Sequence, residues 1–402
     1  MFNIIIFFFS LFVFFLLAIT SGFNAVVSFA VGLLTIFLYQ KKNDLFIVLF
    51  FLLILLNDYF VFLFFCLLFF SAYIYKCLVN KLFDKWVLFS LFSVLVLFVF
   101  SLVNLGSKDL LIRLSVVFCV FIVIPIMVQS LNVRELSAQV YMGIFSVYLS
   151  SFLVNFFVVF YFYNNSRLSI FNGSENIAIG VFYLVALFIF FSNLKSHIKL
   201  FAVVLFLVSC YLSESRTSLI VVFISLLIYF FKRIDGKALL KGGGGISVLL
   251  FISTFLDFDG RKFSFFNNLY SMIYNEDSVQ DMLLLDIRGS LLLDGISIIK
   301  DNFLFGLGAV QPEVFKEMYL TNLATFHNAL IDSLVMYGFI GTLFLGHIVF
   351  LALKKMQFSY NPFLQVTCLT FFMLCFLQPY FFNYQVAGLF MYLCCLHNRN
   401  KI

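Results

Sequence analysis

The run LFSLFSVLVLFVFSLV, residues 88–103, contains no charged residue and no alternation of apolar with polar side chains. A membrane-spanning strand alternates the two kinds of residue over about 10 positions, whereas a membrane-spanning helix needs roughly 20 mainly apolar residues. The segment 86–105 therefore predicts a helix that crosses a bilayer, and not a strand of an outer-membrane barrel. The run IIIFFFSLFVFFLLAI, residues 4–19, has the same character.

The composition of the whole chain agrees with these two runs. Of its 402 residues, 64% are hydrophobic and only 11% are charged, whereas a soluble domain has about 25% charged residues. We expect an all-α polytopic membrane protein with about 12 to 14 transmembrane helices. The segments 45–56 and 59–75 are predicted to form either a re-entrant pair or one long tilted element. The expected spans are 2–20, 23–39, 45–56, 59–75, 86–105, 110–131, 137–163, 177–194, 200–213, 217–231, 246–257, 328–353, 362–378 and 384–396.

The distribution of basic residues predicts the orientation of these spans. With the N-terminus in the cytoplasm, 16 of the 25 Lys and Arg residues fall in cytoplasmic segments and only four in short outside segments. Cytoplasmic loops of membrane proteins carry such an excess, so we expect both termini in the cytoplasm. The chain then divides into an N-terminal bundle (1–257), an extracytoplasmic loop (258–327) and C-terminal helices (328–402). Apolar spacing within residues 283–302 of the loop predicts one or two helices on the membrane face.

The sequence offers no pattern typical of a metal, cofactor or nucleic-acid site. None of the eight cysteines forms a C-x-x-C pair with His neighbours, so we expect no metal site and no cofactor. Most cysteines lie in apolar runs and are interpreted as small hydrophobic residues. The basic residues are dispersed between spans, so nucleic acid is not an expected partner.

Three arginines are expected outside the membrane, each near the edge of a span: Arg167, Arg216 and Arg288. Arginine at a membrane edge often anchors to lipid headgroups. Arg216, however, lies with Glu214 in the short polar turn SESRTSLI, where a planar guanidinium can bind phosphate through two hydrogen bonds. We favour substrate binding over anchoring for Arg216 and Arg288. Both interpretations stay open for Arg167, and Glu214 could pair with an arginine.

His327 has a distinctive setting among the four histidines. It opens the predicted helix 328–353 and is followed by Asn328, and the N-terminal end of a helix favours a bound anion. A neutral histidine there can take a proton from a hydroxyl group, so we predict that His327 is catalytic. His347, inside a span, is expected to be a hydrogen-bonded intramembrane group. His197 and His397 are expected to be solvated in cytoplasmic loops.

Two glycines lie further along the same predicted helix. Gly338 is 11 residues past His327, which is roughly 16 Å along a helix that rises 1.5 Å per residue. It is too far away to touch the same small group. We therefore expect Gly338 and Gly341 to be structural and to allow close packing between helices.

These residues together resemble a known family. His327-Asn328, nine residues and then Gly338 resemble the H-[NSQ]-x9-G pattern of the O-antigen ligase and polymerase superfamily. The resemblance extends to SESRTSLI (213–220), to the arginine of DIRGS (286–290) and to FLFGLGAV (303–310), and it covers roughly residues 165–345.

The resemblance implies a membrane glycosyltransferase of the GT-C type at the periplasmic face of the inner membrane. Such an enzyme transfers a glycan, without a metal, from an undecaprenyl-diphosphate carrier to a hydroxyl group. By resemblance, Arg216 and Arg288 would bind the diphosphate, and His327 would orient or deprotonate the acceptor. Arg167, Asn328 and Glu214 would contact the substrate. The implied partners are the lipid-linked oligosaccharide, the lipid bilayer and a chain-length regulator protein.

The acceptor decides between two activities within this superfamily. A polymerase extends the next carrier-linked repeat unit, whereas a ligase transfers the glycan to the lipid A core. We favour the polymerase, because Phe- and Ile-rich sequences are typical of polymerases from O-antigen gene clusters, and the ligase stays open. A flippase of lipid-linked glycan is a further alternative. A flippase would be expected to show internal repeats and charged residues within the membrane. No tandem repeat is visible in this sequence, and charged residues within its spans are sparse.

Overall fold

The computed structural model describes residues 24–38, 43–56, 58–80, 84–103, 108–131, 136–157, 175–212, 287–307, 326, 328–355, 362–376 and 380–399. These residues form helices and short connections, and no strand occurs among them. The helices are α2 (Asn24–Leu38), α3 (Asn43–Leu55), α4 (Tyr59–Asn80), α5 (Lys85–Val103), α6 (Lys108–Phe118), a π-helical turn η1 (Cys119–Val123), α7 (Ile124–Ser130), α8 (Ala138–Val154), α9 (Glu175–Phe190), α10 (Ser196–Leu212), α15 (Ile287–Asp301), α17 (Ala329–Lys355), α18 (Pro362–Cys375), a 3₁₀ turn η4 (Tyr380–Phe382) and α19 (Tyr384–Arg399).

The predicted fold class, an all-α polytopic membrane protein, is confirmed. Four stretches in the described part of the chain are helical, long and apolar enough to cross a membrane, namely Tyr59–Asn80, Leu111–Ser130, Ala138–Phe157 and Ala329–Lys355. Several shorter apolar helices accompany them. The expected spans 2–20, 217–231 and 246–257 lie outside the described residues, so the number of spans stays a prediction.

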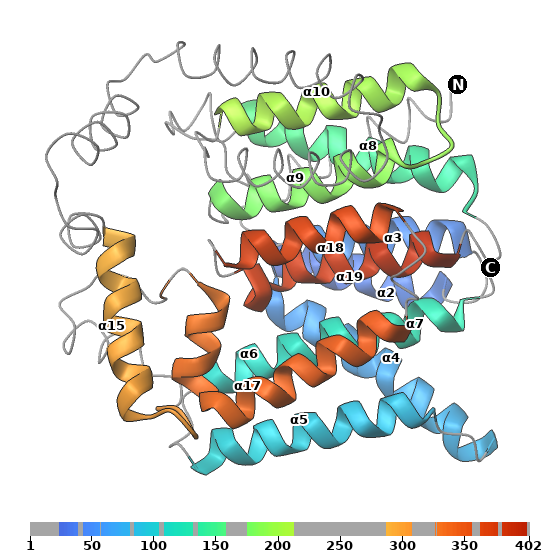
Figure 1. The fold of residues 1–402 in the computed structure, drawn as a ribbon. Coiled ribbons are helices and arrows are strands. Elements are labelled where there is room, and N and C mark those ends of the chain that lie inside the picture. The colour runs from blue at the N-terminus through green and yellow to red at the C-terminus, as the bar shows by residue number, and fades with distance from the viewer. Residues whose placement is uncertain are drawn as a thin grey trace, which may run out of the picture.

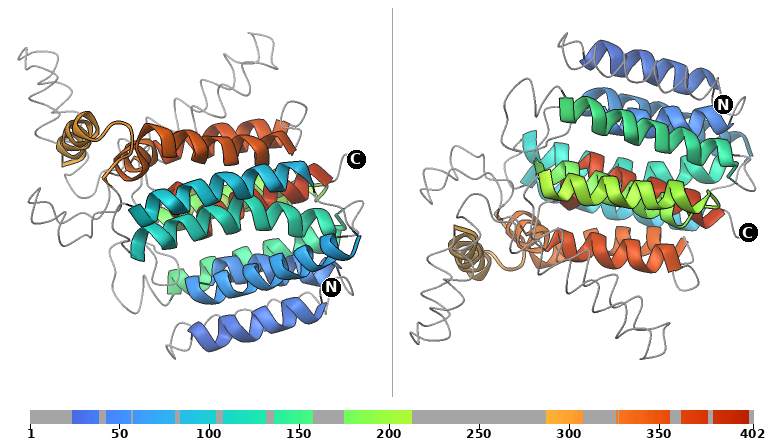
Figure 2. Two further views of the ribbon diagram at one scale, coloured as in Figure 1. Left: turned by 90° about the horizontal axis from the view of Figure 1, so that it is seen from below. Right: turned by 90° about the horizontal axis from the view of Figure 1, so that it is seen from above.

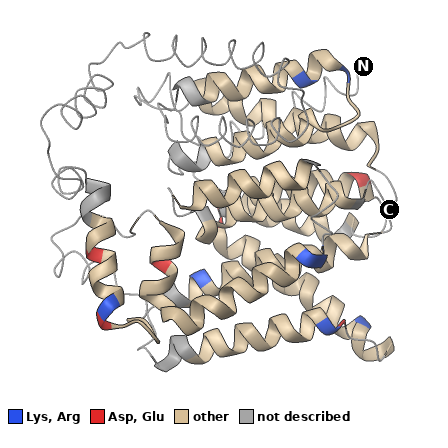
Figure 3. Ribbon diagram, viewed as in Figure 1, with Lys and Arg blue, Asp and Glu red and all other residues tan. Residues whose placement is uncertain are grey.

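Most helices run side by side, and one lies across their ends. Figures 1 and 2 show α15 standing across one end of the bundle, beside the first part of α17. Charged residues gather toward the two ends of the helices, with long uncharged stretches between them (Figure 3). This distribution is what a bilayer imposes, because a charged side chain is costly at its centre.

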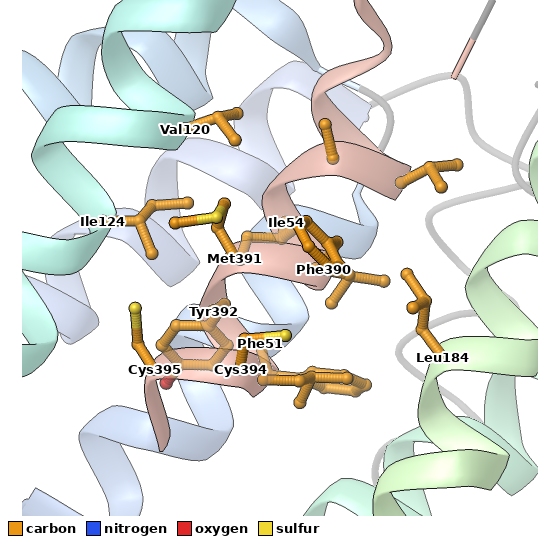
Figure 4. Packing of buried hydrophobic residues seen from close by; sticks show 14 of the residues in the cluster. Phe51, Ile54, Val120, Ile124, Leu184, Phe390, Met391, Tyr392, Cys394 and Cys395 are labelled. Carbon is orange, nitrogen blue, oxygen red and sulfur yellow. The ribbon is translucent and has the colours of Figure 1, made fainter. Parts of the chain in front are cut away.

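Helix α19 lies in the core of the bundle. Its side chains from Val386 to Leu396 are buried, and it packs against α3, α7, α9 and α18. Phe390 stacks on Phe371 of α18 with ring centroids 4.0 Å apart, and Tyr392 lies among the buried residues in Figure 4. The hydroxyl of Tyr392 donates a hydrogen bond of 2.8 Å to the carbonyl of Ile47 in α3. The C-terminal helix thus holds together elements from both halves of the sequence.

The segments 45–56 and 59–75 form two separate helices, α3 and α4. Phe46 and Phe50 of α3 both contact Phe69 of α4, with centroids 5.7 and 6.1 Å apart, so the chain turns back on itself. With 13 residues, α3 is about 20 Å long, shorter than the roughly 30 Å hydrocarbon core. The structure thus excludes one long element, but only α3 is short, because α4 has 22 residues and is long enough to cross a membrane.

The structure shows the surroundings of His347 and His397, for which the sequence predicts an intramembrane hydrogen bond and solvent exposure, respectively. His347 is hydrogen-bonded as predicted, because its Nδ1 lies 3.1 Å from the hydroxyl oxygen of Ser93 in α5. The expectation that His397 is solvated is wrong. It is only 5% exposed, and its ring centroid lies 4.4 Å from that of Phe363. The reason is that α19 continues to Arg399, which carries His397 into the aromatic core and not into a loop.

The two ends of the bundle differ in charge. Figure 1 shows the end of α4, the start of α5, the start of α10 and the end of α17 on the side opposite α15. The lysines at or next to these helix ends are Lys76, Lys85, Lys195, Lys199, Lys354 and Lys355. The side opposite α15 is therefore rich in lysine, as expected of a cytoplasmic face.

Candidate active site

The structure describes part of the predicted site. Asn328, Gly338 and Gly341 belong to the described residues, and Arg288 is placed in the first turn of α15. The predictions for Arg167, Glu214, Arg216 and His327 fall outside the described residues. The geometry of the site therefore rests on α15, on the first part of α17 and on the residues on either side of position 327.

Asn328 forms the N-terminal cap of α17. Its side-chain oxygen accepts hydrogen bonds from the backbone N–H groups of Leu330 and Ile331, at 3.0 and 3.1 Å. Asparagine is among the preferred residues at this position, because it satisfies N–H groups that the helix leaves unpaired. The helix thus begins at Ala329, within one residue of the predicted start at 328. Substrate contact by Asn328 stays a prediction, and its side-chain oxygen already accepts two hydrogen bonds from the helix backbone.

Asp332 reaches back across this cap. One of its carboxylate oxygens accepts a hydrogen bond of 3.0 Å from the backbone N–H of Phe326. Its own N–H donates to the carbonyl of Asn328 at 2.8 Å. Phe326 and Asn328, the two neighbours of His327, are therefore both tied to the first turn of α17.

A small apolar cluster joins α15 to this turn. Phe326 packs with Ile331 and Val335 of α17 and with Leu291 and Ile298 of α15, and all five are buried. Gly295 allows the close approach of α15, because a Cβ there would lie only 2.5 Å from Ile331 and 3.1 Å from the Phe326 ring. Position 288 stands one helical turn before Leu291, so the helix that carries Arg288 is fixed against the residue that precedes His327.

The chain that follows α15 is inserted into a break in α17. At Gly338 the backbone leaves helical geometry, with φ 63° and ψ −172°. The N–H groups of Phe339 and Ile340, freed by the break, donate to the carbonyls of Phe303 and Leu304 at 2.7 and 3.2 Å. In return, the N–H of Leu307 donates to the carbonyl of Val335 at 2.7 Å. The segment 303–307 thereby satisfies backbone groups on both sides of the break.

This geometry changes the expectation for Gly338. We expected Gly338 to allow a second helix to pack closely against an unbroken α17. Instead, Gly338 lies against the backbone of the segment 303–307. The break turns the first part of α17 so that it lies beside α15, while the rest runs through the bundle along α5 (Figure 1). Gly341 lies on the second part and faces α5, where an added Cβ would be 3.5 Å from Leu97.

Arg113, which the sequence analysis did not assign to the site, comes close to it. Its guanidinium lies 3.4 Å from the sulfur of Met336 and 5.4 Å from the centre of the Phe382 ring. It also interacts electrostatically with Asp332 and Tyr337. Arg113 and Met336 are 223 residues apart in sequence. The sequence does contain an indication of this role, because an ionisable residue inside an apolar span is a candidate functional residue.

An apolar groove runs along α17 from its first turn. Its volume is about 200 Å³. Its walls include Ala329, Leu345 and Gly346 of α17, Phe372 of α18 and Phe376, which follows the end of α18. An added Cβ at Gly346 would meet no atom within 4 Å. The groove therefore offers an apolar surface that begins beside the helix start carrying Asn328.

Comparison with known protein families tests the resemblance described from the sequence. Residues 201–346 match the family model described as O-antigen ligase. This range contains every predicted site residue except Arg167. No match was found among curated proteins. The resemblance to the O-antigen ligase and polymerase superfamily is thus confirmed for a range that is less than half of the 402-residue chain.

Proposed function

We propose that this membrane protein is a glycosyltransferase that polymerises undecaprenyl-diphosphate-linked O-antigen repeat units. The family match over residues 201–346 carries the proposal. The packing of α15 against the start of α17 supports it, because two of the predicted catalytic positions, 288 and 327, fall on segments that are joined by Phe326 and Leu291. A chain-length regulator protein is a proposed partner of such a polymerase.

The proposed reaction is a single displacement at the anomeric carbon of the donor. The acceptor hydroxyl oxygen forms a bond to that carbon while the bond from the carbon to the carrier diphosphate breaks, so the anomeric configuration is inverted. His327 accepts the hydroxyl proton. Arg216 and Arg288 offset the charge on the departing diphosphate, and no metal ion is needed for this role.

The remaining predicted residues contact the substrate in this proposal. Arg167 and Glu214 would lie near the glycan or the diphosphate, and Asn328 would add to the contacts at the helix start. The acceptor and the glycan approach from the side that bears α15. In the proposed division of the chain, the loop 258–327 contributes Arg288 and His327, the bundle 1–257 contributes Arg216, and the helices 328–402 hold the His-bearing end in place.

The groove beside α17 suits a lipid-linked donor. A polyprenyl chain is a long hydrocarbon, and Leu345, Val349 and Phe372 offer it an apolar wall. The groove begins at Ala329, two residues past the proposed base. A carrier whose diphosphate lies at this helix start can therefore place its hydrocarbon chain along α17.

The orientation proposed for the protein follows from its charge. The lysine-rich end of the bundle would face the cytoplasm, and α15 would face the periplasm at the outer surface of the inner membrane. Both termini would then be cytoplasmic. Attachment of a protease-sensitive tag to either terminus and treatment of spheroplasts with the protease measures this directly. Cleavage of the tag from outside would contradict the orientation.

The alternative is an O-antigen ligase, because the family match is compatible with either activity. A deletion strain separates the two activities through its lipopolysaccharide. A core that carries a single repeat unit supports the polymerase. A bare core with carrier-linked polymer supports the ligase and overturns the polymerase, whereas a normal ladder contradicts both.

A further inference from the structure

We propose that Asp332 is a positioning residue for His327, and that the charge of Arg113 stabilises Asp332 in that role. The proposal rests on the proposed function, because the catalytic role of His327 comes from there. Neither residue belongs to the predicted site. The Asp332 carboxylate accepts a hydrogen bond from the N–H of Phe326, the residue that precedes His327.

This hydrogen bond restricts the chain at the catalytic position. The N–H of Phe326 is held by Asp332, and Asn328 is held as the cap of α17. The side chain of Phe326 is only 6% exposed and is fixed in the cluster with α15. Both neighbours of position 327 are therefore tethered, Phe326 through its N–H and its side chain and Asn328 through its side-chain oxygen. A base must meet the acceptor hydroxyl at hydrogen-bond distance, so such a tether bears on the rate.

The burial of Asp332 is costly unless its charge is balanced. The residue is 2% exposed. Its second carboxylate oxygen has no hydrogen-bond partner within the part of the chain that the structure describes. A buried carboxylate without a compensating charge is destabilising. A nearby positive charge offsets part of this cost, and the electrostatic interaction with Arg113 acts in that direction, against the larger effect of burial.

Arg113 is arranged to act through its charge. Its two contacts, with the Met336 sulfur and the Phe382 ring, are with uncharged groups. No carboxylate in the described ranges forms an ion pair with it. The aromatic ring and the sulfur hold the guanidinium in place, while its positive charge remains available to Asp332. Because Arg113 lies on α6, the start of α17 is fixed to the bundle as well as to α15.

The test uses the purified full-length enzyme and a lipid-linked repeat unit as substrate. Asp332→Ala removes both the acceptor oxygen and the charge, and a misplaced catalytic group costs about 100-fold in rate. We expect kcat per folded molecule to fall by that factor, with KM for the donor nearly unchanged. Asp332→Asn keeps an acceptor oxygen, so it should restore much of kcat and leave a deficit of several-fold. Asp294→Asn is the matched control, because it makes the same change on α15 away from the cap.

The role of Arg113 is tested by combining two changes. Arg113→Gln leaves the Asp332 charge uncompensated and should lower the Tm of the purified protein. Adding Asp332→Asn removes that charge, so the double variant should recover at least half of the lost Tm. Additive losses in Tm would overturn the part assigned to Arg113.

The outcomes distinguish this proposal from the proposed function. If His327→Ala is inactive but Asp332→Ala keeps the wild-type kcat, positioning by Asp332 is wrong and the proposed function stands. A lower Tm with an unchanged kcat has the same meaning, because a merely structural residue gives that result. If Asp332→Ala does not fold, a wild-type kcat in Asp332→Asn overturns the proposal. Full activity of His327→Ala would instead reject the proposed function.

Discussion

Gly306 and Gly338 face each other backbone to backbone, although they are 32 residues apart in sequence. Both have positive φ, 71° and 63°. A Cβ added at Gly306 would lie 2.5 Å from the backbone nitrogen of Gly338, and a Cβ added at Gly338 would meet the backbone of Gly306 and Leu304. This mutual contact locks the segment after α15 into the break in α17. The elements that carry Arg288 and His327 are thereby connected twice, by the apolar cluster and by this backbone junction.

The first prediction concerns this junction. Gly338→Ala should lower stability by at least about 2 kcal/mol, because its φ and ψ are nearly restricted to glycine and the new Cβ meets backbone atoms that cannot rotate away. The expected fall in Tm is ~2 °C or more for a chain of this length, measured by thermal unfolding in detergent. Gly346→Ala is the control, since it lies on the same helix with open space around its Cβ and should leave Tm unchanged or slightly higher. An equal Tm for the two variants would contradict the backbone junction.

The second prediction concerns the proposed catalytic residues. His327→Ala and Arg288→Ala should abolish long glycan chains while leaving the amount of membrane-inserted protein unchanged. The first removes the base and the second removes a cation that stabilises the leaving group. Complementation of a deletion strain and silver-stained gels of its lipopolysaccharide measure this. Lys300→Ala, an exposed change on the same helix α15, should give the normal ladder. A normal ladder from both test variants would reject the catalytic assignment.

The third prediction is that the reaction needs no metal ion. The proposed mechanism uses arginines in place of a metal ion, so the purified enzyme should retain its activity in EDTA. Polymer formation from the lipid-linked repeat unit, with and without chelator, is the measurement. Loss of activity that a divalent ion restores would show that a metal takes part in the reaction.

The sequence was sufficient to predict the helices, because a bilayer leaves few alternatives to an apolar run of adequate length. The predicted segment 328–353 appears as Ala329–Lys355, and 362–378 as Pro362–Cys375. The cap by Asn328 also follows from a local preference, in which asparagine precedes the first helical turn. These features depend on neighbouring residues alone, which is why they could be predicted.

Features that depend on distant segments were not predictable in the same way. Hydropathy stays high through Gly338, so it gives no sign of the break, whose partner is the loop 303–307. The burial of His397 depends on Phe363 of another helix. Arg113 reaches the site through its contact with Met336, which is 223 residues away in sequence. In each case the deciding contact joins residues that a local pattern does not connect.

The last prediction concerns the apolar groove. If the carrier's hydrocarbon chain lies along α17, Gly346→Trp should obstruct it, because the glycine faces open space and its replacement can fill that space without disturbing the backbone. KM for the lipid-linked donor should then rise several-fold, while Tm stays near that of the wild type. Leu343→Trp is the matched control, since Leu343 is on the same helix, is 57% exposed and does not line the groove. A water-soluble donor with a short isoprenoid should be affected less by Gly346→Trp than the full-length carrier, because it would not extend as far along α17. Equal KM values for Gly346→Trp and Leu343→Trp with the full-length donor would place the hydrocarbon chain elsewhere.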